Sequence, residues 1–214
     1  MNQNKRHSRQ RGFTLIELLV VVLLLSIIVG AIFSQIERAQ VRYRVEDQKV
    51  DLTQQEREFI DQFTRDLHQA GYPSAAVMGP AATANQVASG LVSISGTDLV
   101  MEGDVDGTGT VQRVEYSYFD GSGWPGPGPN PCPCLRRSAQ PKGAAGPATN
   151  FTEVQNVIGT TFFTALKSDG TAANNLPSTK AVQITLTTQG VTQDNDLHKS
   201  IQVTMTGIAR LVNN

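Results

Sequence analysis

The chain has 214 residues, which suits one domain with an extension and is too short for two large domains. Hydrophobic residues make up 39% of the sequence and charged residues 17%, a balance that excludes disorder throughout. The net charge of -1 disfavours a generally basic nucleic-acid-binding protein. Three histidines and two cysteines make a structural zinc site hard to assemble, because the cysteines stand only one residue apart.

The N-terminal part of the sequence predicts a membrane anchor. Residues 1–12 carry basic and no acidic side chains, and residues 13–33 form an apolar run whose single charge is Glu17. About 20 apolar residues span a bilayer as a helix, and the basic flank predicts that the rest of the chain lies outside the cytoplasm. The run is longer than the apolar region of a secretory signal and no Ala-x-Ala pattern closes it. A plain signal anchor remains open.

Glu17 is the informative residue of this run. A carboxylate in a membrane helix costs a few kcal/mol on insertion scales and is usually functional. The alternative is a Glu at the start of a helix, close enough to the interface to reach it and favoured by the helix dipole.

The stretch 11–20, Arg-Gly-Phe-Thr-Leu-Ile-Glu-Leu-Leu-Val, resembles the class III signal of type IV prepilins and type II secretion pseudopilins. The resemblance implies that a prepilin peptidase cuts after Gly12 and methylates the new N-terminal residue, Phe13. It also implies that Glu17 pairs with the N-terminal amine of a neighbouring subunit during assembly, which would give a buried charge its partner. Residues 1–12 would then be a cleaved leader, and residues 13–33 a transmembrane and filament-core helix.

Residues 34–71 are expected to continue the helix as an amphipathic segment. No Pro or Gly interrupts residues 34–70, while Gly71 and Pro73 predict the end of the helix. One helical face is apolar and should pack on the head: Val41, Val45, Leu52, Phe59, Phe63, Leu67 and Ala70. The charged residues between them, Glu56 and Asp66 included, are expected on the opposite, polar side.

Residues 72–214 are expected to form a β-rich globular head with a Pro/Gly-rich loop at 121–147. Strands are predicted at 91–95, 99–102 and 111–119, and within a mixed segment at 154–166. Segments 181–188 and 199–208 alternate cleanly and predict an antiparallel pair joined by residues 190–197. One-sided alternation leaves one buried face for the helix to cover. The fold class is therefore α+β, a long N-terminal helix packed on a small antiparallel sheet.

The segment 63–72, Phe-Thr-Arg-Asp-Leu-His-Gln-Ala-Gly-Tyr, is similar to the end of the long helix in PilW-type minor pilins and in the pseudopilin J subunit of type II secretion. An Asp-x-Asp-Gly loop before a Val-x-Tyr-x-Tyr strand, and a later Leu-Arg-Arg, also look like the PilW pattern. The stretch 121–147 departs from that pattern. The resemblance implies a type IV pilin-like fold.

The acidic loop that begins at Asp104 has the spacing of an EF-hand loop. Side chains of Asp104, Asp106, Thr108 and Glu115 and the carbonyl of Thr110 could supply the oxygens that Ca²⁺ prefers. Against this, no helix is expected on either side, and Glu115 should point outward from a strand. The preferred interpretation is a Gly-rich hairpin loop whose Asp side chains accept backbone hydrogen bonds.

Cys132 and Cys134 are expected to oxidise outside the cytoplasm. A bridge between them would close a small, strained ring, so a bridge to another subunit and free thiols remain alternatives. No helix start lies beside them, and no redox-catalytic role is expected.

The basic cluster of the head comprises Arg136, Arg137 and Lys142, with Trp124 nearby. Basic and aromatic groups together can bind single-stranded DNA, but three residues in an acidic protein predict a solvated loop, and nucleic acid is not an expected partner. We find no Ser-His-Asp set, no phosphate-binding loop and no paired catalytic carboxylates, so an enzyme is not expected.

The favoured hypothesis is a PilW-type minor pilin, a structural subunit of a type IV pilus. Its expected partners are other pilins through the N-terminal helix, the prepilin peptidase and the inner-membrane assembly platform. It would sit in the inner membrane by a single span, with its head outside the cytoplasm, and then in the pilus at the cell surface. The alternatives are a J-type secretion pseudopilin and a tip module that binds a surface through loop 121–147 or the acidic loop.

Overall fold

A computed structural model describes residues 13–122, 133–145, 151–194 and 199–213 of the chain. It divides into two compact units, Met1–Arg44 and Val45–Asn214. Helix α1 (Leu15–Gln69) begins in the first unit and ends in the second. The predicted helix is therefore confirmed, and it ends at Gln69, two residues before the expected stop at Gly71.

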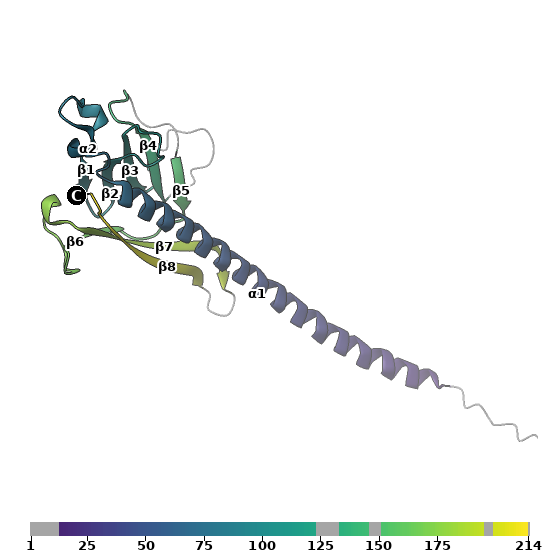
Figure 1. Cartoon of the computed structure of the whole chain (residues 1–214). Helices are drawn as coiled ribbons and strands as arrows, with labels where there is room; N and C mark the ends of the chain where they lie inside the picture. Colours follow the sequence, from purple (N-terminus) through teal and green to yellow (C-terminus); the bar gives the residue numbers. More distant parts are fainter. Residues whose placement is uncertain (1–12, 123–132, 146–150, 195–198, 214) are drawn as a thin grey trace, which may run out of the picture. The chain divides into compact units, whose positions relative to one another are not determined.

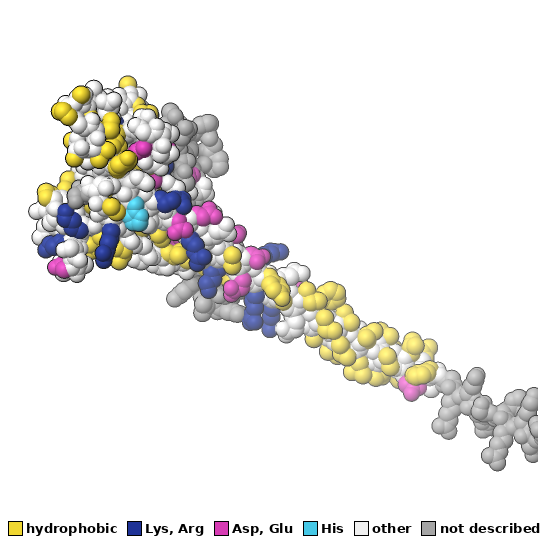
Figure 2. Space-filling view, in the orientation of Figure 1, with side chains coloured by type: hydrophobic (Ala, Val, Ile, Leu, Met, Phe, Trp, Pro, Cys, Tyr) yellow, Lys and Arg dark blue, Asp and Glu magenta, His cyan; other side chains and the backbone are white. Residues whose placement is uncertain are grey.

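In the first unit α1 presents its apolar side chains to the outside. Every residue from 13 to 33 is exposed, and Figure 2 shows a continuous hydrophobic surface along this part of the helix. By length and composition this is the one described helix that could cross a membrane. Leu, Ile and Val at nearly every position give the segment no polar face, so its surface requires lipid or protein around it.

The head contains two antiparallel sheets (Figure 1). The five-stranded sheet has the order β1-β2-β3-β4-β5: Gly90–Ile94, Asp98–Gly103, Gln112–Phe119, Cys134–Pro141 and Phe151–Gln155. The three-stranded sheet has the order β6-β7-β8: Phe163–Leu166, Ala181–Asp194 and Lys199–Arg210. Two short helical turns, α2 (Ala75–Met78) and η1 (Ala84–Gln86), lie between α1 and β1, and a third, η2 (Leu176–Ser178), lies between β6 and β7.

The α+β class is confirmed, with two corrections to the predicted head. Strand β4 falls inside the predicted loop 121–147, where it pairs with β3 from Phe119↔Cys134 to Gln112↔Pro141. Its signal is weak because only Cys134 and Leu135 are buried and most of the remaining residues are polar. The expected small sheet is two sheets, since the mixed segment 154–166 is divided between the end of β5 and β6.

The C-terminal part of α1 lies against both sheets and completes one hydrophobic core. Phe63 is fully buried, and its ring lies 5.3 Å from Tyr116 of β3 and 5.8 Å from Phe163 of β6. Gly207 of β8 lets the strand approach Ile60, because a Cβ there would clash with the Ile60 side chain. Close helix–sheet packing therefore fixes the face that α1 presents to the head.

Two charged residues of α1 lie on its buried face and not, as predicted, on its polar side. Glu56 is 0% exposed and Asp66 is 1% exposed, so both belong to the face that packs on the sheets. The positions allow this, because Glu56 stands three residues before Phe59 and Asp66 three after Phe63, which is helical spacing. A buried charge of this kind requires partners, which are described below.

Candidate functional site

The start of α1 carries a reciprocal cap between Thr14 and Glu17. The Thr14 N–H and hydroxyl donate to Glu17 Oε2 over 3.4 and 3.3 Å, and the Glu17 N–H donates to Thr14 Oγ1 over 3.4 Å. These are long bonds, and the Glu17 carboxylate is exposed. The residues form a capping box, which supports the helix-start interpretation and still leaves the carboxylate open to a further partner.

Of the predicted cleavage pair, Gly12 lies outside the described residues. Phe13 is 77% exposed and stands two residues before the first residue of α1. Cleavage after Gly12 would therefore place the new amine next to the start of the helix, within one turn of Glu17. Processing and methylation themselves remain predictions.

The acidic loop connects β2 to β3 and is held by its own hydrogen bonds. Asp104 Oδ2 accepts from the Gly109 N–H at 3.0 Å, and Asp106 Oδ1 accepts from the N–H and hydroxyl of Thr108 at 3.1 and 2.8 Å. Gln112 donates to Asp106 Oδ2. These bonds are the ones expected of a hairpin turn.

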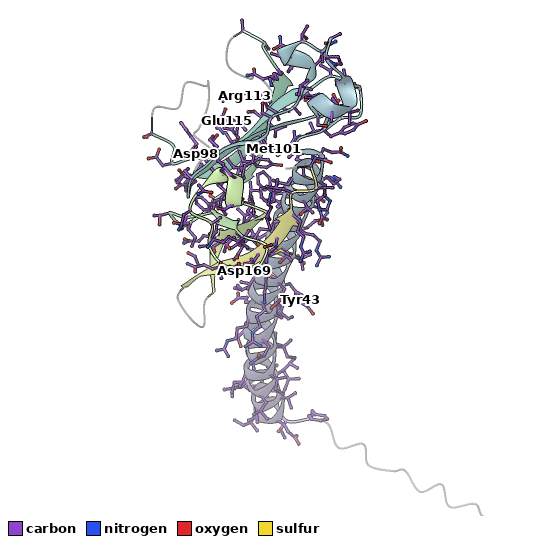
Figure 3. All side chains as sticks on the ribbon, turned by 60° about the vertical axis from the view of Figure 1, so that its left-hand side comes forward. Tyr43, Asp98, Met101, Arg113, Glu115 and Asp169 are labelled. Atoms are coloured by element: carbon purple, nitrogen blue, oxygen red, sulfur yellow. The ribbon has the colours of Figure 1, made fainter. Side chains whose placement is uncertain are left out.

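Glu115 does not join that loop. The β2–β3 register pairs Gly103 with Gln112 at the loop and Val100 with Glu115 three pairs farther along the strands. Glu115 is exposed there, as is Arg113 on the same strand (Figure 3). The twelfth position of the EF-hand pattern is thus removed from the others.

Cys134 begins β4, is 0% exposed and takes part in a disulfide. Cys132 lies outside the described residues, and so does Trp124. The predicted pairing of Cys132 with Cys134 remains a prediction.

The basic cluster is not a solvated loop, which corrects the sequence interpretation. Its three side chains are only 12–18% exposed, lie on β4 or directly after it, and each pairs with a carboxylate. The pairs are Arg136 Nε with Glu153 Oε2 at 3.0 Å, Arg137 Nε with Asp66 Oδ2 at 2.5 Å and Lys142 Nζ with Glu102 Oε2 at 2.6 Å. Pairing within the head reduces the positive charge that these residues can offer to a polyanion.

Asp66 anchors α1 to the five-stranded sheet. Its Oδ2 accepts from the Tyr116 hydroxyl at 2.7 Å and from Arg137 Nε, and its Oδ1 accepts from Gln62 Nε2 at 2.7 Å. Burial, followed by the charge of Asp66, raises the pKa of Tyr116 well above its ordinary value. Burial disfavours the charged Arg137, but the Asp66 carboxylate outweighs it and raises the pKa of the guanidinium. The Arg-Asp-Leu segment noted in the sequence thus contributes a buried structural ion pair.

Glu56 joins α1 to the three-stranded sheet. Its Oε1 accepts from the N–H and hydroxyl of Thr188 at 3.1 and 2.8 Å, while Oε2 is buried without a hydrogen-bond partner among the described residues. Burial raises the pKa of Glu56 by more than the Thr188 hydrogen bonds lower it. Sequence reasoning missed both carboxylates, although their positions on the apolar face were a readable signal.

Comparison with known proteins gives one family match. The model described as the prokaryotic N-terminal methylation motif matches residues 7–33. Searches of curated proteins and of solved structures gave no match. The motif suggests a structural rather than an enzymatic subunit, and with the exposed apolar helix it is consistent with an inner-membrane anchor. The N-terminal methylation motif therefore supports a place for this chain among the type IV pilins and pseudopilins.

Proposed function

We propose that the chain is a minor pilin: a structural subunit of a type IV pilus, made as a membrane-anchored precursor and involved in pilus assembly or its initiation. The observation that carries the proposal is the methylation motif at residues 7–33, whose described residues 13–33 are all exposed and from Leu15 onward lie in α1. In the precursor, lipid covers that surface; in a filament, the same surfaces of neighbouring subunits cover it.

Glu17 supports an assembly role for the segment. Among the described residues its carboxylate makes only long bonds to Thr14, and an ionised carboxylate among apolar neighbours needs a stronger partner. The amine created by cleavage after Gly12 is such a partner. It can come from an adjacent subunit, because the helix start is exposed.

The PilW-type assignment rests on the segment 63–72. In this fold the segment is the end of α1: Asp66 binds Tyr116 and Arg137, and the Gly71 N–H donates to Glu102 O at 2.9 Å. The segment therefore supports a resemblance to the end of the long helix in both PilW-type minor pilins and J-type pseudopilins. It favours a pilus subunit and a J-type secretion pseudopilin equally, so the pseudopilin is the second candidate. A tip module that engages a surface through its loops is compatible with either.

A matched pair of glycine substitutions tests the proposal. Gly12→Val should block cleavage by a co-expressed prepilin peptidase, so that the precursor keeps its leader and is absent from sheared filaments. Gly30→Val is the control within the apolar run, because a side chain at Gly30 meets nothing within 4 Å. It should be cleaved like the wild type.

Equal processing of the wild type and of Gly12→Val would contradict the proposal. Recovery of the processed chain with extended surface filaments would favour the pilus. Recovery only with a secretion apparatus would favour the pseudopilin.

A further inference from the structure

The acidic loop holds a carboxylate oxygen that the fold does not satisfy. Asp104 is only 8% exposed. Its Oδ2 bonds across the loop to the Gly109 N–H, which directs the carboxylate into the loop, but Oδ1 is buried and has no hydrogen-bond partner among the described residues. Buried carboxylate oxygens without a partner are costly, so this atom calls for a specific explanation.

Turn formation alone does not explain Asp104. The head has other Asp-Gly-Thr/Ser turns with the hydrogen bonds of Asp106-Gly107-Thr108, at Asp169 and at Asp120. Neither of these turns has a buried carboxylate two residues earlier in the sequence. The additional acid at position 104 is what distinguishes the β2–β3 loop.

The two carboxylates of the loop lie close to each other. The pKa of Asp106 is lowered chiefly by the hydrogen bond from Thr108, and the Asp104 carboxyl is near enough to interact with it. Together the two carboxylates offer the oxygen ligands that a hard cation prefers.

We propose that residues 104–109 bind Ca²⁺ through Asp104 and Asp106, with hydroxyl and main-chain carbonyl oxygens of the loop and water completing the shell. All of these donors are oxygens, which suits Ca²⁺ rather than zinc. In the described part of the chain no three His, Cys, Asp or Glu side chains group around a metal position, so the charge of the site is low. Low ligand charge predicts that the loop binds Ca²⁺ weakly, as extracellular Ca²⁺-binding modules do, with Kd about 10⁻⁴–10⁻³ M.

The burial of Asp104 Oδ1 is compatible with an ion. Oxygens at about 2.3–2.6 Å from a central Ca²⁺ leave a hole too small for a water molecule, so they are inaccessible to solvent. The loop also adjoins the end of α1, because the Asp104 N–H donates to Tyr72 O at 2.8 Å. Bound Ca²⁺ would therefore stiffen the contact between the helix end and the β2–β3 hairpin.

Thermal unfolding of the full-length chain in detergent micelles tests the site, followed by near-UV circular dichroism of the buried aromatic rings. Relative to EDTA, 10 mM CaCl₂ should raise the midpoint by about 3–6 °C, as expected for a Kd near 1 mM, and 10 mM MgCl₂ should raise it by much less. Asp106→Asn should abolish the Ca²⁺ shift. Asp169→Asn, in the matched exposed turn (Figure 3), should keep it.

The proposal is overturned if Ca²⁺ leaves the wild-type midpoint unchanged, if Mg²⁺ acts equally, or if Asp106→Asn retains the shift. Calorimetric titration of the wild type with CaCl₂ gives a second readout that needs no variant. Absence of binding heat up to 10 mM would also overturn it.

Discussion

The buried ion pair between Asp66 and Arg137 should be a main anchor of α1 on the head. Asp66→Asn keeps the shape of the side chain and removes its charge. Arg137 then remains 85% buried without a countercharge, since its side chain is 15% exposed. The Tyr116 hydroxyl also loses a charged acceptor.

The size of the effect follows from these contacts. Removing one partner of a buried ion pair costs about 3–5 kcal/mol of the free energy of unfolding. Arg137 borders a surface pocket of about 510 Å³, from which water can reach the guanidinium, so we expect the lower end, about 3 kcal/mol. For a unit of this size each kcal/mol lowers Tm by about 2–4 °C, which gives a loss of about 6–12 °C. Tyr116→Phe removes one hydrogen bond to a charged group and should cost about 1.5 kcal/mol.

Near-UV circular dichroism of the full chain in detergent micelles measures both losses, because the buried aromatic rings report the packed head. Asp61→Asn is the matched control: it lies on the same helix, is exposed, and should change stability by less than about 0.5 kcal/mol. Tyr116→Phe should also cost less in the Asp66→Asn background than alone. If Asp66→Asn is as mild as Asp61→Asn, the ion pair does not anchor the helix.

Three further predictions concern α1. Because the pKa of Glu56 is raised above 4.5 in the folded head, its contribution to stability is full below that pH and is lost as the pH rises through the folded-state pKa. The Glu56→Gln variant should therefore lose less stability than the wild type between pH 4 and 7.5 in urea titrations; parallel profiles would contradict this. Gly207→Ala should cost about 1–3 kcal/mol through its clash with Ile60, and adding Ile60→Ala should cost less than the sum of the single changes; strict additivity in thermal unfolding would exclude the clash. Glu17→Gln keeps an acceptor for the capping box but removes the charge, so its recovery in filaments should fall more than tenfold; wild-type incorporation would mean that capping is the whole role of Glu17.

The features that could be predicted from the sequence are those with a strong periodic or compositional signal. The sequence predicts the apolar run, the end of α1 just before Gly71 and the alternating pair β7–β8. Their hydrophobic residues recur at the spacing of one helix or one strand face, so local sequence decides the structure.

The features that could not be predicted depend on residues far apart in the sequence. The largely polar strand β4 is held between β3 and β5 by backbone pairing, and its Arg136 and Arg137 are accommodated by ion pairs with Glu153 and Asp66. The residues near position 136 in the sequence give no indication of those partners. The EF-hand spacing predicts that Asp104, Asp106 and Glu115 lie together, but the β2–β3 register places Glu115 away from the two aspartates.

The most direct test of the proposed function is a mass spectrum of the N-terminal peptide, taken separately from sheared filaments and from the membrane fraction. A subunit of a type IV pilus should give a peptide beginning at methylated Phe13 in the filament fraction. The same peptide in the membrane fraction alone would favour a scarce initiator or a secretion pseudopilin. An intact leader in both fractions would contradict the proposal and leave a membrane-anchored β-domain.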